Sequence, residues 1–269
     1  MPASHVQRFG PSALFIALST TPESSFLAVQ QLIVALEALP LFGVREMVRG
    51  YTTLLVEFTA AEFCSDALLD RIKECVESVG AGEKLVAPVE TRLIDVPVCY
   101  DGPDLERVAQ HAGLTTAEVI GFHTGGLCQV HFLGFAPGFP YLSGLDTRLA
   151  TPRLITPRPR VSPGSVGIGG NQTGIYSVAT PGGWNLIGRT SLPLFSPQAV
   201  AGEQMFLFRP GDRVRFVAVD ELEQPPKLET TPTHRELGSP ILKVLRNGAG
   251  ITLQDAGRPG WKRYGVPEG

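Results

Sequence analysis

The chain has 269 residues, a formal net charge of −3, and a composition of 43% hydrophobic and 18% charged residues. These values are ordinary for a folded globular protein, and they exclude a disordered chain or one with a strongly basic face for nucleic acids. The length exceeds the usual domain size of roughly 100 to 150 residues, which favours two domains. No apolar run approaches the ~20 residues that span a bilayer, and the N-terminus lacks a signal-peptide pattern. We therefore expect a cytoplasmic protein without nucleic-acid or membrane partners.

Residues 1–95 alternate strand-like and helix-like patterns in the order βαββαβ. Two helical stripes, from Phe26 to Leu36 and from Leu68 to Val79, place apolar residues at three- and four-residue spacing. This layout predicts a four-stranded antiparallel sheet with two helices on one face. The expected strands are Ser12–Leu18, Val44–Arg49, Thr52–Phe58 and Leu85–Val96.

Two short helices are expected next, at Asp101–Ala112 and Thr116–His123. A capping box of Thr115 and Glu118 begins the second one. His123 then lies at a helix C-terminus, where the helix dipole favours a cationic imidazole, and a simple helix cap is the alternative interpretation. His131 falls in an alternating strand, which indicates a part-buried histidine.

Between residues 121 and 188 glycine and proline become dense, which is typical of an all-β barrel or sandwich. Its last strand pair is expected at Gln204–Phe208 and Arg213–Val219, joined by a Pro-Gly-Asp turn. A proline-rich, polar stretch follows and indicates a linker. The expected division is therefore 1–95 and 96–220 for two domains, 221–240 for the linker, and 241–269 for the truncated start of a third domain.

Candidate site residues cluster around the glycine-dense stretch between residues 164 and 183. Glycine allows positive φ or a close approach of backbone to a ligand, although turns alone explain the same composition. Four arginines flank the stretch, namely Arg153, Arg158, Arg160 and Arg189. Their guanidinium groups suit a carboxylate or a phosphate, although a single arginine is usually a solvated surface residue. Hydrogen-bonding and aromatic groups, some of which can equally be core, are Gln172, Thr173, Tyr176, Trp184 and Asn185.

Familiar catalytic and nucleotide motifs are not matched. Gly170 and Asn171 stand where a Walker loop needs Lys and Ser or Thr, and the GxGxxG pattern that starts at Gly167 ends on Gln172. Neither a GxSxG elbow nor an HExxH pair occurs, so we expect no metal site. From the motifs alone, no nucleotide-binding loop is identified.

The segments LGFAPGFPYLSGLD and PRPRVSPGSVGIGGNQTGIYSVATPGGWNLIGRT, followed by LPLF, resemble the allophanate hydrolase subunit 1 family. That family includes the B subunit of 5-oxoprolinase and a sporulation kinase inhibitor, and the resemblance covers about Gln7 to Val219. It implies an α+β protein with an N-terminal ferredoxin-like βαββαβ domain and a C-terminal cyclophilin-like β-barrel.

The C-terminal segment VLRNGAGITLQDAGRPGWKRYGVPEG is similar to the opening of the partner family, allophanate hydrolase subunit 2, which includes the C subunit of 5-oxoprolinase. The alternative is a C-terminal hairpin folded back on the barrel. Because so short an opening cannot bury a core of its own, we expect residues 241–269 to be poorly packed or taken into a partner's sheet.

The resemblance implies a component of an ATP-hydrolysing 5-oxoprolinase, which opens 5-oxo-L-proline to L-glutamate. Its partners would be a C-subunit-like domain and the separate A-subunit protein. ATP serves the complex, and the isolated chain is expected to be inactive. One alternative is the carboxyltransferase half of a biotin-dependent urea carboxylase, and another is a regulatory inhibitor of a sensor histidine kinase.

The same resemblance and the pattern of polar groups give the expected site. The residues expected to act in catalysis are His123, Arg189 and Gln172. Those expected to bind the small amide substrate are Arg153, Arg160, Gly169, Gly170, Thr173, Tyr176, Gly183 and Trp184.

Overall fold

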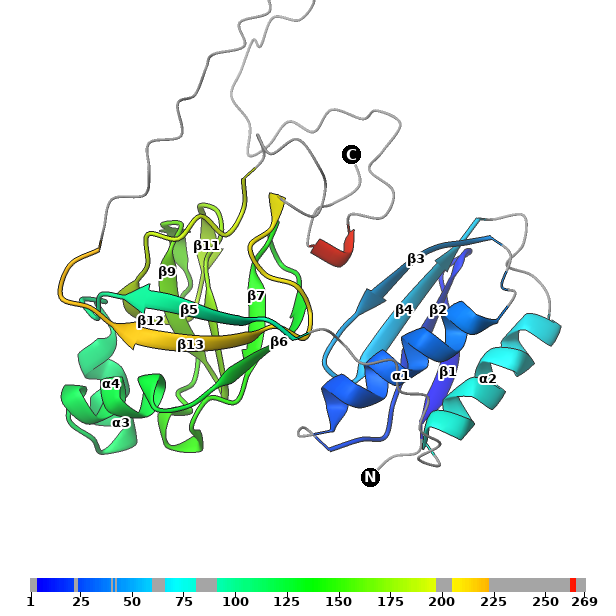
Figure 1. The fold of residues 1–269 in the computed structure, drawn as a ribbon, viewed down its shortest axis with the longest axis horizontal. Coiled ribbons are helices and arrows are strands. Elements are labelled where there is room, and N and C mark those ends of the chain that lie inside the picture. Colours follow the sequence, from blue (N-terminus) through cyan, green and yellow to red (C-terminus); the bar gives the residue numbers. More distant parts are fainter. Residues whose placement is uncertain are drawn as a thin grey trace, which may run out of the picture.

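A computed structural model describes residues 4–21, 24–39, 41, 43–59, 66–80, 91–196, 205–222 and 262–264. They form two sheet-based units that lie next to each other (Figure 1). The units touch at Tyr51, whose ring packs 4.8 Å from the ring of His131 and whose hydroxyl donates to the carbonyl of Leu142 at 3.4 Å. Within the described ranges, no helix is both long and apolar enough to cross a membrane.

The N-terminal unit is a four-stranded antiparallel sheet in the order β1-β2-β4-β3. Helices α1 and α2 lie on one face of it (Figure 1), and side chains such as Ile16, Leu54 and Val56 are fully buried between the layers. Its elements are β1 (His5–Phe9), β2 (Ala13–Ala17), α1 (Ser25–Ala38), β3 (Val44–Arg49), β4 (Thr53–Phe58) and α2 (Asp66–Gly80).

The predicted ferredoxin-like βαββαβ layout is not confirmed, because the described elements follow the order ββαββα. Strand β1 was not expected, since its residues are mostly exposed and carry no apolar alternation. It forms through a hairpin with β2 around Gly10, whose φ is +65°. The expected last strand, Leu85–Val96, is wrong as a member of this sheet: its described end belongs to β5 (Leu93–Val98), which pairs in parallel with β13 (Arg213–Ala218).

The second unit is a nearly closed, barrel-like sheet in the order β12-β9-β10-β7-β6-β13-β5, consistent with the predicted cyclophilin-like barrel. A backbone bridge joins its two end strands, because Cys99 and Arg189 exchange two N–H···O bonds of 2.9 Å each. Its remaining strands are β6 (Cys128–Leu133), β7 (Pro140–Ser143), β9 (Ser165–Gly169), β10 (Gln172–Ile175) and β12 (Asn185–Arg189).

Smaller elements surround the barrel. Helices α3 (Leu105–Ala112) and α4 (Thr116–Thr124) lie at one end of it (Figure 1). The predicted capping box at the start of α4 is confirmed, since the Thr115 hydroxyl accepts the Glu118 amide and the Glu118 carboxylate accepts the Thr115 amide. The others are η1 (Thr147–Leu149), η3 (Lys262–Tyr264) and a two-stranded ribbon of β8 (Arg158–Val161) and β11 (Thr180–Gly182).

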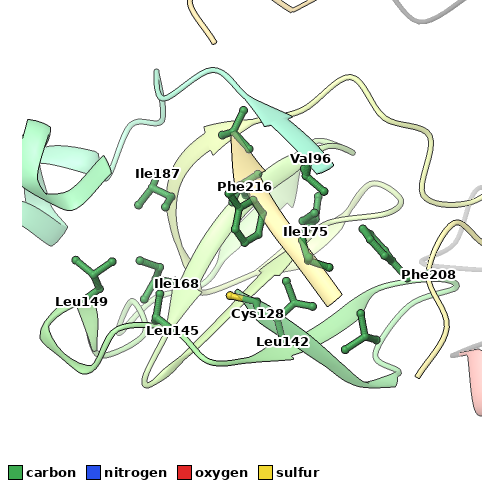
Figure 2. Close-up of a cluster of buried hydrophobic side chains, with 14 of the residues drawn as sticks. Val96, Cys128, Leu142, Leu145, Leu149, Ile168, Ile175, Ile187, Phe208 and Phe216 are labelled. Atoms are coloured by element: carbon green, nitrogen blue, oxygen red, sulfur yellow. The ribbon is translucent and has the colours of Figure 1, made fainter. Parts of the chain in front are cut away.

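The barrel interior is filled by aliphatic and aromatic side chains from every wall. Figure 2 shows Val96, Ile175 and Phe216 pointing toward one another between the strands, and all are at most 1% exposed. Cys128 is buried in this core, whereas Cys75 and Cys99 are only partly buried. Cys64 lies outside the described residues.

The expected strand pair at the end of the barrel is half wrong. Arg213–Ala218 is a strand, but its partners are β5 and β6. Met205 to Phe208 make no strand, and Phe206 forms only an isolated bridge to Phe195. The Pro-Gly-Asp turn was a valid local signal, but it does not determine which strands pair. Of the linker and the segment at 241–269, only residues 221–222 and Lys262–Tyr264 lie within the described ranges.

Barrel closure predicts a strong effect at Gly188. A Cβ there would lie 2.6 Å from the Cys99 carbonyl oxygen and 2.8 Å from Val98 Cγ1. Gly188→Ala is therefore expected to lower the free energy of unfolding by about 1–3 kcal/mol, measured by urea denaturation. Gly121→Ala in α4 is the matched control, because nothing lies within 4 Å of a Cβ at that site and alanine favours a helix. Equal stability of the two variants would contradict the closure argument.

Candidate substrate cavity

A small aromatic cavity of about 170 Å³ opens beside the β8–β11 ribbon. Its walls come from the loop after β6, from β7, from the loop before β8, and from the residues around β11. A cavity of this size suits a small molecule, because larger ligands occupy several hundred Å³. It is lined by Phe135, Phe139, Tyr141, Arg153, Leu154, Pro157, Tyr176, Gly182, Gly183 and Trp184.

Trp184 is the central wall of the cavity and is 5% exposed. Its ring lies against glycines of two strands: a Cβ on Gly169 would come within 2.7 Å of the indole, and one on Gly174 within 3.0 Å. Phe139 meets the ring edge-on, with centroids 5.6 Å apart. At Gly169 and Gly174 the space left by the missing side chain is therefore filled by an aromatic ring.

Phe135 was missed by sequence reasoning although it stands at the cavity. Its φ of +67° is a left-handed conformation that a bulky residue rarely adopts, and its side chain is 59% exposed. The ring still packs edge-on against Phe139 at 5.4 Å and Tyr176 at 6.3 Å. Such strain, worth about 1–3 kcal/mol, persists only where surrounding contacts hold it, and it is concentrated at functional sites. No sequence signal for it exists, because phenylalanine is not a turn residue.

Arg153 supplies the charge of the cavity. Among the described residues that line it, this side chain alone carries a formal charge, and its guanidinium carbon lies 5.5 Å from the centre of the Trp184 ring. By contrast, Arg158 is committed to the fold: it pairs at 2.7 Å with Asp104, whose other oxygen accepts the Leu186 amide. Arg153 is therefore the group that can receive a carboxylate.

His123 lies in the barrel interior, away from the cavity lining, and is 2% exposed. The Thr173 hydroxyl donates to the Gly167 carbonyl at 3.1 Å, so it must accept from His123 Nε2 at 3.0 Å. His123 Nδ1 then accepts from the Tyr100 hydroxyl at 2.7 Å. Burial lowers the pKa of His123 to about 3, so the imidazole is neutral and the cationic form expected at a helix end is wrong.

The structure brings some of the expected site residues together and leaves others apart. Arg153, Tyr176, Gly183 and Trp184 line the cavity. Gly169 lies against the Trp184 ring, and Thr173 is buried and hydrogen-bonded to His123 in the barrel interior. Gly170 forms the β9–β10 turn, where its amide donates to the Thr151 carbonyl. The side chain of Arg160 is exposed on β8.

Arg189 pairs at 2.8 Å with Asp101 at the barrel seam, roughly 16 Å along a strand from Trp184. Gln172 opens β10 and is partly exposed. Neither residue lines the cavity, and neither does His123. The catalytic roles of these three residues therefore stay predictions.

Comparison with known proteins matches residues 4–207 to the family described as the carboxyltransferase domain, subdomain C and D. The chain is 38% identical over 226 residues to the B subunit of 5-oxoprolinase from Bacillus subtilis, an alignment that covers 80% of this chain and 93% of that protein. The crystal structure of TTHA0988 matches 80% of this chain at 34% identity with a TM-score of 0.65, and this chain spans 40% of that one. The crystal structure of the K. lactis urea amidolyase matches 80% of this chain at 20% identity with a TM-score of 0.66, and the match covers 15% of the amidolyase chain. At this identity the likeness shows the fold alone.

The buried imidazole of His123 predicts a pH dependence of stability. Its pKa is about 3 in the folded chain and 6.5 when unperturbed, so the unfolded chain binds more protons below pH 6.5 and stability falls as pH drops. His123→Gln should remove roughly 2 kcal/mol of the stability lost between pH 6 and pH 4, measured by urea unfolding at each pH. His131, whose pKa burial lowers to about 4, contributes in both proteins. His111→Gln on the exposed face of α3 is the control, and an unchanged slope in His123→Gln would contradict the burial argument.

Proposed function

Because the chain belongs to the family of the carboxyltransferase domain, subdomain C and D, we propose that it is the B-subunit-like component of an ATP-dependent 5-oxoprolinase. The complex opens 5-oxo-L-proline to L-glutamate at the expense of ATP, and its other parts are a C-subunit-like domain and the A-subunit protein. The B. subtilis relative, which aligns over nearly its whole length, supports this assignment.

The position of Arg153 over the Trp184 ring carries the proposal. The substrate, 5-oxo-L-proline, is a small flat lactam ring with one carboxylate. Aromatic walls suit the faces of such a ring, and the guanidinium of Arg153 suits its carboxylate with a charge-assisted, forked hydrogen bond. In this proposal the chain binds and orients the lactam, excluding water from its faces with Phe139 and Trp184.

Proton transfer is proposed to depend on a partner. Burial raises the pKa of both cavity phenols, Tyr141 and Tyr176, so these hydroxyls stay neutral hydrogen-bond donors. Among the described lining residues none carries a carboxylate or an imidazole. The C-subunit-like domain is therefore proposed to supply the acid–base group, which is consistent with an inactive isolated chain.

ATP is assigned to the complex and not to a described site in this chain. The glycine-rich β9–β10 hairpin does not fit a phosphate-binding loop, because its backbone is paired within the sheet, with Gln172 opposite Gly169 and Thr173 opposite Ile168. The Gly170 amide is likewise bound to the Thr151 carbonyl.

A urea carboxylase-like carboxyltransferase is the second candidate, since K. lactis urea amidolyase has the same fold over 80% of this chain. Biotin would be needed only under that alternative. Urea is uncharged, so it gives Arg153 no carboxylate to bind, and the two candidates differ in their need for this side chain.

Arg153→Ala in the complete complex should lower kcat/KM for 5-oxoproline by about 10- to 100-fold, the loss expected for a hydrogen bond to a charged group. ATP-dependent glutamate formation is the measurement. Arg148→Ala is the matched control, because Arg148 pairs with Asp146 and stacks on Phe122 outside the cavity.

Two results would count against this assignment. Equal kinetics of the Arg153 and Arg148 variants would remove the cavity from the reaction. A complete wild-type complex that forms no glutamate but carboxylates urea would replace the first candidate by the second. Gln172→Ala and Arg189→Ala in the same assay test the roles predicted for those side chains.

A further inference from the structure

Two carboxylates stand opposite each other in the N-terminal sheet. Glu46 on β3 and Glu57 on β4 are register partners next to a bulge. Because Val56 and Phe58 of β4 are buried against the helices, Glu57 between them points to the other face of the sheet. Like charges directly opposite in a sheet are destabilising, so this pair needs cations.

The short helix η3 supplies both cations. Lys262 Nζ lies 2.7 and 2.8 Å from the two carboxylate oxygens of Glu57. Arg263 donates its backbone N–H to Glu46 Oε1 at 2.9 Å, and its Nε is 3.7 Å from the same oxygen. The Glu46 side chain is only 1% exposed, a burial that is costly for a carboxylate unless it is paired. The charges and spacing of the two acids therefore match a Lys-Arg dipeptide.

Tyr264 extends the same contact onto the barrel. Its ring stacks on Phe206 with centroids 4.5 Å apart and an angle of 7° between the planes. Its carbonyl accepts the amide of Gly138 at 2.8 Å. Figure 1 shows η3 lying between β3 and the barrel, so three consecutive residues bind both units at once.

Gly138 connects this contact to the cavity, because it ends the loop of residues 134–138 that carries Phe135 (the Phe135 loop). Inside the loop, Ala136 donates to the Gly134 carbonyl and Phe139 donates to the Ala136 carbonyl. The hydrogen bond from the Gly138 amide to the Tyr264 carbonyl connects the loop to η3. The strained φ of Phe135 needs such support from its surroundings.

We propose that the Glu46–Glu57 pair and the Phe206 ring form a docking site for the Lys262–Tyr264 segment, and that its docking holds the Phe135 loop in the conformation that closes the aromatic cavity. The segment is thus a positioning element. None of its three residues is part of the described cavity lining, and it acts through the Gly138 amide and the loop.

Charge reversal tests the docking site in the full-length chain. Lys262→Glu places a third carboxylate beside the acidic pair, so the segment should leave its site and free the Gly138 amide. Hydrogen–deuterium exchange of the peptide covering residues 134–139 should then accelerate by about fivefold or more. Lys262→Glu combined with Glu57→Lys restores the ion pair in reverse and should return exchange to within about twofold of the wild type.

Lys73→Glu is the matched control, since it makes the same charge change against Asp70 on the exposed face of α2. Tyr264→Ala should accelerate exchange through loss of the Phe206 stack, and Tyr264→Phe, which keeps the ring, should not. A thermal unfolding curve for each variant separates undocking from general destabilisation.

The cavity provides a second readout. Trp261→Phe leaves Trp184 as the only tryptophan of the two in the chain, so its emission reports on the cavity. In this background Lys262→Glu should shift the emission to longer wavelength, and the double charge swap should reverse the shift. These measurements need no substrate, so they stand apart from the assignment as a 5-oxoprolinase component. Unchanged exchange and emission in Lys262→Glu, or no recovery in the charge swap, would overturn the proposal.

Discussion

The backbone bridge between Cys99 and Arg189 is the constraint on which the barrel depends. It brings the end of β5 against the end of β12, two strands far apart in the chain, and so leaves neither end strand of the sheet fully open. At the other end of β12, the Leu186 amide donates to the Asp104 carboxylate. Trp184, which directly precedes β12, is a wall of the cavity. Because Gly188 faces the Cys99 carbonyl, the closure itself requires a residue without a side chain.

The cavity also depends on glycines that leave room for neighbouring groups. Trp184 can pack against two strands only because Gly169 and Gly174 leave room for its ring. The ring held in this position is the one over which the Arg153 guanidinium lies. Another wall is the Phe135 loop, where Phe135 has a left-handed φ and the Gly138 amide donates to the Tyr264 carbonyl. The Trp184 side of the cavity thus depends on packing within the barrel, and the Phe135 side is bonded to a segment that also contacts the N-terminal sheet.

Local signals predicted elements well and pairings poorly. The β3 strand and the capping box of α4 were expected where they occur, because each depends on neighbours a few residues away. The partner of β5 was wrong because a parallel pairing depends on a distant strand and leaves no trace in periodicity. Of the expected site residues, Arg153, Tyr176, Gly183 and Trp184 line the aromatic cavity, whereas Arg189 lies at the barrel seam and His123 in the core, and the roles of all of them stay predictions.

By itself the sequence determined the two helices of the N-terminal unit, the glycine-dense barrel that follows, and the family. The helices are indicated by the spacing of apolar residues, the barrel by its dense glycines and prolines, and the family by motifs in a fixed order. Only the tertiary structure decided the protonation of His123, which is neutral because the barrel excludes water around it. It also decided that Glu46 and Glu57 face each other and meet Lys262 and Arg263. Electrostatic and aromatic contacts of this kind depend on distance in space, which the order of residues along a chain does not contain.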